Sequence, residues 1–178
     1  MSFLIYPTIR EAPFLSLVGM GGGGTGLTQA GVSGVAQDYE SMTTTSTSFS
    51  SSYPLANLWD GNINNVMENT GNSGTNYVTI SFTSGLFPSV STLRVYGLLN
   101  SNQYDDRSVS VNGGSYYTPN VYGSTQWWDL VANTDFSAGS ALNEIKFRAN
   151  PNSGGQNPSV SMRAVEVNGD ILVQGEIR

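Results

Sequence analysis

Hydrophobic and polar residues alternate along much of the chain after residue 40, which is the pattern of strands with one face in a core. In the segment 77–82, Val78, Ile80 and Phe82 fall on one side of an extended chain, while Thr79 and Ser81 fall on the other. The predicted strands are 77–82, 92–98, 107–111, 126–131, 142–149, 159–167 and 171–173, with one more ending near Phe49. Short strands at this spacing predict an all-β fold, an antiparallel β-sandwich of the jelly-roll kind.

Turn residues and composition support the same fold class. The pairs Asn112-Gly113 and Asn168-Gly169 each follow a β-branched strand and supply the positive φ angles that tight hairpin turns need. Charged residues make up 11% of the chain, and Lys146 is its one lysine. Because an exposed helix usually carries many Lys and Glu residues on its outer face, long surface helices are not expected.

The N-terminal segment has a different character, so we predict two parts: an extended Gly-rich arm over 1–38 and a sandwich over 39–178. Pro7 and Pro13 interrupt the apolar residues of the arm, and a glycine run follows at 21–24. Such an arm is expected to dock on another subunit, or alternatively to fold back on its own domain. The predicted docking residues are Phe3, Ile5, Tyr6, Phe14, Leu15, Leu17, Gly21 and Gly22.

The residue content argues against several function classes. The chain has no histidine and no cysteine, which removes the commonest general base and the best soft nucleophile, so no catalytic residues and no enzyme activity are predicted. A net charge of −6 with scattered arginines disfavours nucleic acid and anionic membrane surfaces as partners. The start of the chain lacks a signal-peptide pattern and no stretch is long enough to span a membrane, so synthesis in the host cytoplasm is expected.

Three segments carry a resemblance to a known family. The stretch Leu55-Ala56-Asn57-Leu58-Trp59-Asp60-Gly61-Asn62, the strand 142–147 and the ending 162–169 resemble, in this order, the discoidin-like, galactose-binding-like family of carbohydrate-binding jelly rolls, over roughly residues 40–173. The resemblance implies a structural Ca²⁺ in the first loop, with Asn57, Asp60 and Asn62 as ligands. The acidic ligand that the family has on its last strand falls near Ala164 here, and the alternative is a turn held by hydrogen bonds alone.

Sugar binding in such folds uses aromatic side chains and polar loop groups, and this chain offers several aromatic candidates. The predicted glycan contacts are Trp59, Tyr104, Tyr116, Tyr117 and Trp128, with Tyr122 and Trp127 as further candidates. Because Trp127 and Trp128 are adjacent in a predicted strand, one is expected in the core and the other on the surface.

The chain as a whole resembles virion structural proteins of tailed bacteriophages in its arm, its Gly-, Ser-, Thr- and Asn-rich composition and its ending AVEVNGDILV. This resemblance implies a capsid decoration (cement) protein or a tail-attached module, docked on other virion proteins and forming a homo-oligomer in the virion. The alternative function is carbohydrate recognition, as the receptor-binding module of a tail fibre or a similar adhesin. No cofactor is predicted apart from Ca²⁺.

Overall fold

The computed structural model describes residues 37–175 except 72, 99–104, 119–124 and 152–156. The predicted arm residues at positions 3–22 therefore lie outside the described part. The elements are β1 (Thr43–Thr45), the 3₁₀-helix η1 (Leu55–Leu58), β2 (Met67–Glu68), β3 (Asn76–Ser81), β4 (Leu93–Leu98), β5 (Asp105–Val111), β6 (Thr125–Leu130), β7 (Glu144–Pro151), β8 (Ser161–Val167) and β9 (Asp170–Ile171).

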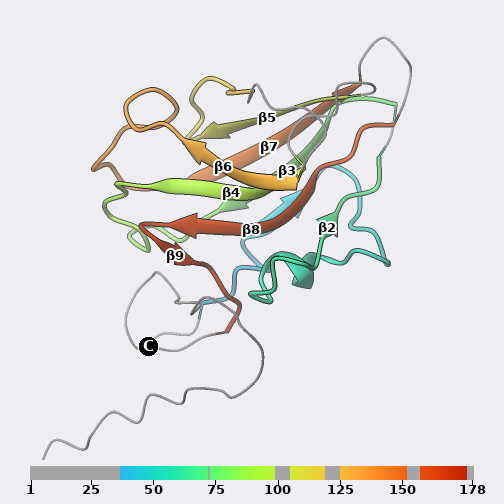
Figure 1. Cartoon of the computed structure of the whole chain (residues 1–178), viewed down its shortest axis with the longest axis horizontal. Helices are drawn as coiled ribbons and strands as arrows, with labels where there is room; N and C mark the ends of the chain where they lie inside the picture. The colour runs from blue at the N-terminus through green and yellow to red at the C-terminus, as the bar shows by residue number, and fades with distance from the viewer. Residues whose placement is uncertain (1–36, 72, 99–104, 119–124, 152–156, 176–178) are drawn as a thin grey trace, which may run out of the picture.

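The strands form two antiparallel sheets, and successive strands from β1 to β8 alternate between them (Figure 1). One sheet has the order β1-β3-β7-β5, and the other has the order β2-β8-β4-β6, with β9 paired to β8. Every strand pairing is antiparallel. The predicted all-β, antiparallel β-sandwich is therefore confirmed.

The core lies between the sheets and is built from the alternating apolar positions. In β3, Val78 and Ile80 are fully buried, and they lie opposite Phe147 and Ile145 of β7. The second sheet contributes Val95 of β4, which pairs with a buried valine of β8. This single core supplies the apolar burial that drives the fold.

The turns behave as their sequences predict. Asn168 and Gly169 have φ angles of 54° and 90° and join β8 to β9 in a hairpin, while Asn112 and Gly113 have φ angles of 50° and 70° after β5. Asn168 also anchors the start of β4, because its Oδ1 accepts a hydrogen bond from the backbone N–H of Ser91 at 2.7 Å.

Within the described residues, no helix has the length and apolar character needed to cross a membrane.

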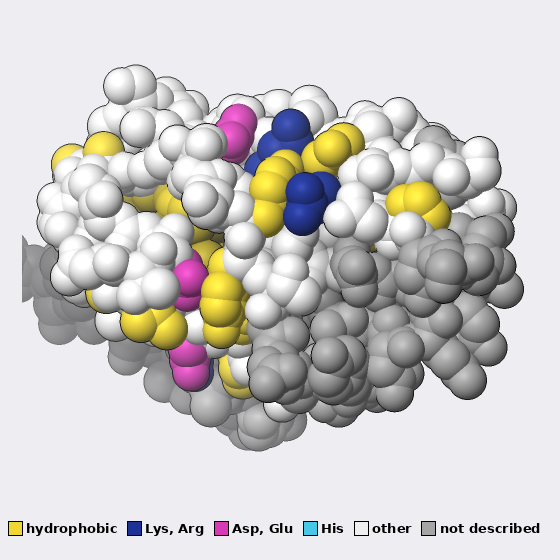
Figure 2. All heavy atoms as spheres, turned by 90° about the horizontal axis from the view of Figure 1, so that it is seen from above, with side chains coloured by type: hydrophobic (Ala, Val, Ile, Leu, Met, Phe, Trp, Pro, Cys, Tyr) yellow, Lys and Arg dark blue, Asp and Glu magenta, His cyan; other side chains and the backbone are white. Residues whose placement is uncertain are grey.

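Charged side chains are few on the surface, and the basic ones are not evenly spread. Figure 2 shows Lys and Arg side chains gathered at one place beside hydrophobic side chains, on a face that also carries a few separate Asp and Glu side chains. The ends of the described chain also meet, since the backbone N–H of Gly175 donates to the carbonyl of Gln37 at 2.9 Å.

Candidate functional site

Trp59, predicted as a glycan contact, lies in the core. The indole is fully buried and stacks on the buried ring of Tyr39, with ring centroids 5.1 Å apart. An aromatic ring must offer an open face to a sugar, so the prediction for Trp59 is wrong. The apolar residues of η1, which precedes it, bring Trp59 inward against the N-terminal start of the sandwich.

The adjacent tryptophans of β6 point to opposite faces, as expected, but Trp128 is the buried one. It is 5% exposed and packs against the half-buried ring of Tyr117 at 5.8 Å, so neither ring is presented as an open platform and the prediction for Trp128 is wrong. Trp127 is half-buried on the outer face, where Tyr96 lies 5.1 Å from it and the guanidinium of Arg94 lies 4.3 Å above its ring.

Tyr116 is placed on the outer face of the first sheet, half-buried beneath the guanidinium of Arg148. Tyr104 and Tyr122 lie outside the described residues. Among the candidates that the structure describes, Tyr117 and Trp128 are in contact, but the aromatic rings do not form one exposed site.

The Asp60 loop, where the resemblance implies calcium, is held by its own hydrogen bonds. Asp60 Oδ1 accepts from the backbone N–H of Asn62 at 2.7 Å, and Oδ2 accepts from the side-chain amide of Asn65 at 2.5 Å. The amide of Asn57 donates to the Val66 carbonyl at 2.8 Å. No group of three or more His, Cys, Asp or Glu side chains that could hold a metal ion occurs among the described residues. The geometry matches the alternative of a hydrogen-bonded turn, and the calcium site stays a prediction.

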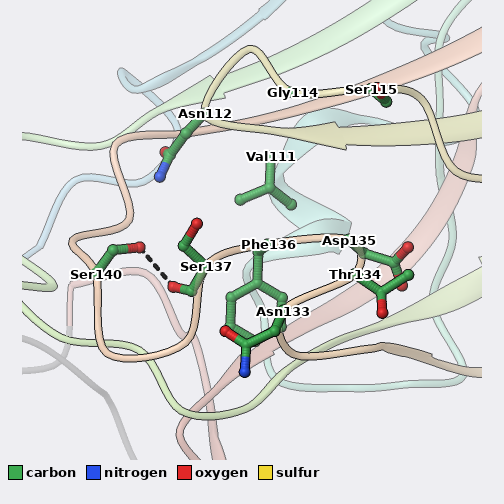
Figure 3. A pocket seen from close by; sticks show the side chains of 10 residues that line it. All are labelled: Val111, Asn112, Gly114, Ser115, Asn133, Thr134, Asp135, Phe136, Ser137 and Ser140. Atoms are coloured by element: carbon green, nitrogen blue, oxygen red, sulfur yellow. Dashed lines mark hydrogen bonds between the residues drawn. The ribbon is translucent and has the colours of Figure 1, made fainter.

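A pocket of about 390 Å³ lies between the turn that follows β5 and the loop that joins β6 to β7, and we take it as the candidate site. Figure 3 shows the two loops facing each other across it. The lining is mostly polar, with Val111 and Phe136 as its apolar members. The full lining is Val111, Asn112, Gly114, Ser115, Asn133, Thr134, Asp135, Phe136, Ser137 and Ser140.

Hydrogen bonds fix the walls of this pocket. Asn112 Oδ1 accepts from the backbone N–H groups of Asn143 and Glu144 at 2.8 and 3.0 Å, and its amide donates to the Ala141 carbonyl at 2.7 Å. Asn112 therefore ties the turn after β5 to the strand β7 that follows the opposite loop.

The opposite loop is fixed from within. Asn133 has a φ of 62°, a left-handed conformation that asparagine tolerates, and its Oδ1 accepts from the Ala138 N–H at 3.2 Å. Asp135 Oδ2 accepts from the Val131 N–H at 2.6 Å, and Ser140 donates to the Ser137 carbonyl at 2.5 Å. The site is therefore preorganised, which reduces the entropic cost of binding.

Several polar groups of the lining are not used by the fold. The hydroxyls of Ser115, Thr134 and Ser137 and the Oδ1 atom of Asp135 have no hydrogen-bond partner among the described residues. Phe136, 8% exposed, lies beside them. Unused hydroxyl and carboxylate groups around a small apolar surface suit a ligand that carries both hydroxyls and C–H faces.

The sequence gives a weak signal for this site. The run Asn133-Thr134-Asp135 lies between two predicted strands and is typical of a loop, but a polar loop is common in sandwiches. The Asn112-Gly113 turn lies across the pocket from this run, 20 residues away in sequence. This proximity can be predicted only when the order of the strands in the sheets is known. The aromatic residues of the sequence therefore do not indicate this site, whose lining is mainly small and polar.

Comparisons with known proteins report a loose structural similarity. No protein-family model matches the chain, and no curated protein matches it. Among solved structures, the family 32 carbohydrate-binding module from C. perfringens NanJ, in complex with galactose, is similar over 74% of this chain and 97% of that chain, with 20% sequence identity and a TM-score of 0.40.

Proposed function

We propose that this chain is a non-catalytic carbohydrate-binding module that holds a polyhydroxylated ligand in the pocket between residues 111–115 and 133–140. The observation that carries the proposal is the set of unused hydroxyl and carboxylate groups in a wall that the fold holds rigid. The volume of about 390 Å³ is in the range of small-ligand sites and accommodates one or two sugar rings.

The chemistry of the lining favours binding over catalysis. Asp135 is the one titratable side chain among the lining residues. Glycoside hydrolysis usually takes two carboxyl groups on either side of the scissile bond. A single carboxylate beside hydroxyls can instead accept hydrogen bonds from sugar hydroxyls, which orients a ligand without cleaving it.

The setting that we propose for this module is a bacteriophage particle, either as a tail-fibre receptor-binding domain or as a decoration protein. This part of the proposal rests on the sequence of residues 1–38, whose apolar and glycine-rich composition suits docking on another virion protein or in a homo-oligomer. Glycan recognition and attachment to a particle are compatible, because the pocket residues belong to the sandwich and not to the arm.

The test is a titration of the ¹⁵N-labelled full chain with neutral sugars: glucose, galactose, mannose, fucose and N-acetylglucosamine. We expect amide shifts confined to 111–115 and 133–140 for at least one sugar. Replacing Thr134→Val together with Ser137→Ala should weaken that binding about tenfold, as expected for the loss of two hydrogen bonds. Thr44→Val, at an exposed position on β1, is the matched control and should have no effect. Shifts elsewhere, or unchanged affinity in the double variant, would contradict the proposal.

A further inference from the structure

The outer face of the β1-β3-β7-β5 sheet carries two cations that the fold does not neutralise. Lys146 and Arg148 are two residues apart in β7, so both point to the outer face, about 7 Å apart along the strand. Within the described residues, the one ion pair joins Arg94 and Glu166, and neither cation of β7 has a carboxylate partner there. In a chain of net charge −6, two unpaired cations side by side are a local exception.

Each of these cations lies over a tyrosine ring. Lys146 Nζ is 4.5 Å from the ring centroid of Tyr77, which belongs to the neighbouring strand β3. Arg148 Cζ is 3.8 Å from the ring centroid of Tyr116, which lies on the other side, beyond β5. The two cations are therefore flanked by tyrosines across the sheet.

Ser108 and Ser110, the floor residues beneath the two cations, already have hydrogen-bond partners. Arg148 Nε donates to Ser108 Oγ at 3.0 Å, which fixes the guanidinium at one nitrogen. Ser110, also buried, donates to the Gly114 carbonyl at 2.8 Å. The terminal nitrogens of Arg148 and the ammonium of Lys146 have no hydrogen-bond partner among the described residues, so their donors remain open to a ligand.

The pKa of Tyr116 is affected by other groups of this face. Burial raises the pKa of the Tyr116 phenol, the nearby Tyr77 adds to this effect, and the positive charge of Arg148 opposes it. Glu144, two residues before Lys146 on the same face, also raises this pKa. The surface thus has a basic and aromatic part around Arg148 and an acidic end at Glu144.

We propose that this face, defined by Tyr77, Lys146, Arg148 and Tyr116, is a second binding surface for the carboxylate-bearing residues of an acidic polysaccharide. A guanidinium with free terminal nitrogens matches a carboxylate in a bidentate pair, and Lys146 adds a second charge next to it. Flanking tyrosines offer ring edges and hydroxyls to the C–H and hydroxyl groups of a sugar ring. An acidic polysaccharide can place its carboxylates on the cations and its sugar rings against the tyrosines at the same time.

The small number of cations on this surface favours a polyuronate over a nucleic acid as its ligand. Nucleic acids bind by neutralising many closely spaced phosphates, whereas this surface has two cations, and the acidic Glu144 limits it at one end. A polyuronate carries a single charge on each sugar ring, and its rings are spaced several ångströms apart along the chain. Lys146 and Arg148, about 7 Å apart on the same face of β7, match the wide spacing of the carboxylates along such a polysaccharide.

This surface is distinct from the pocket proposed above, although the two are close. Ser115 lines the pocket, and the next residue, Tyr116, lies under Arg148. The inference does not require sugar binding in the pocket, because the ligand contacts on the sheet face come from other residues.

The test compares two probes that differ in the carboxylate: β-1,4-mannuronate oligomers and β-1,4-mannose oligomers of equal length, titrated into the ¹⁵N-labelled full chain. We expect the mannuronate oligomers to shift the amides of 145–149 and of Tyr116, with binding weakened by added NaCl, and the mannose oligomers to leave these amides unshifted. Lys146→Gln and Arg148→Gln should each weaken mannuronate binding at least about fivefold, the equivalent of about 1 kcal/mol.

Glu144→Gln is the matched control, since it changes charge on the same face in the opposite direction and should strengthen binding of the mannuronate oligomers. Lys146→Gln keeps the proposal testable if Arg148→Gln fails to fold, because Lys146 makes no hydrogen bond with the floor residues. Sodium sulfate at equal ionic strength serves as a free-anion probe. The proposal is overturned if sulfate gives the same shifts and affinity as the oligomer, if the mannose oligomers bind this face equally well, or if neither cation variant weakens binding.

Discussion

Arg94 and Glu166 face each other across β4 and β8 and form a two-pronged ion pair on the outer face of the second sheet. Arg94 Nε donates to Glu166 Oε1 at 2.6 Å, and Nη2 donates to Oε2 at 2.5 Å. The pair raises the pKa of Arg94 above its already high ordinary value. The two side chains differ in exposure, 38% for Arg94 and 10% for Glu166, and this difference decides what happens when either partner is lost.

Arg94→Met should destabilise the protein more than Glu166→Ala. Removing the arginine leaves a largely buried carboxylate without its two donors, at a cost of roughly 2–4 kcal/mol. Removing the glutamate leaves a guanidinium that water can reach, at a cost of about 1 kcal/mol. Urea unfolding of both variants and of the double variant checks this order, and the double variant should lose less than the sum of the single losses. Equal losses in the free energy of unfolding for the two single variants would contradict the argument from the difference in exposure.

Adjacent tryptophans in β6 provide a matched pair for a packing test. Trp128→Ala should cost about 3–5 kcal/mol, because it empties a nearly fully buried position in the core. Trp127→Ala should cost about 1–2 kcal/mol, since its half-buried ring loses its contacts with Tyr96 and Arg94 but empties no core position. Thermal unfolding followed by circular dichroism gives both values, and a larger loss for Trp127 would contradict the assignment of the two faces.

Asp38, near the start of the sandwich, should make the contact between residues 38–41 and Gln174 sensitive to acid. Its Oδ1 accepts hydrogen bonds from the side-chain amide of Gln174 at 2.8 Å and from the Ser41 N–H at 3.1 Å, and these bonds hold the pKa of Asp38 below its ordinary value. A lowered carboxyl pKa gives stability that is present above the ordinary value and is lost as the pH falls through the folded-state value. The effect is therefore expected below about pH 4.

A carboxyl-detected NMR titration of Asp38 measures this pKa directly. Gln174→Ala should move the pKa of Asp38 up towards its ordinary value, because the largest contribution comes from the Gln174 amide. A pKa of Asp38 that does not respond to Gln174→Ala would contradict this account.

The strands were predictable because their signal is local. The alternation of Val78 and Ile80 with polar neighbours leaves one choice of buried face, and the pairing with Ile145 and Phe147 follows once both segments are strands. The turn at Asn168 was equally clear, since its positive φ is a property of two adjacent residues. The two-residue strand β2 and the 3₁₀-helix η1 were missed, because their pairing depends on β8 and on the core.

The candidate site was less predictable because exposure depends on distant parts of the chain. Trp59 is in a loop-like stretch, yet Tyr39 covers it from a position 20 residues earlier. Trp127 and Trp128 are adjacent aromatic residues of one strand, and the packing of the other sheet against β6 decides which one faces the core. Asn112 and Asn133 likewise line one pocket only because the chain crosses from the first sheet to the second between β5 and β6.

Deletion of residues 1–36 should leave the sandwich as stable as the full chain if the arm docks on another subunit. The core residues and the Gln37–Gly175 hydrogen bond are all retained in such a protein, so its unfolding temperature should match that of the full chain within about 2 °C. Deletion of residues 1–39 is the control, because it also removes the buried Tyr39 ring, a loss of about 3–5 kcal/mol for an aromatic residue in a core. A marked loss of stability in the shorter deletion would instead show that the arm packs on its own domain, and the docking hypothesis would then fail.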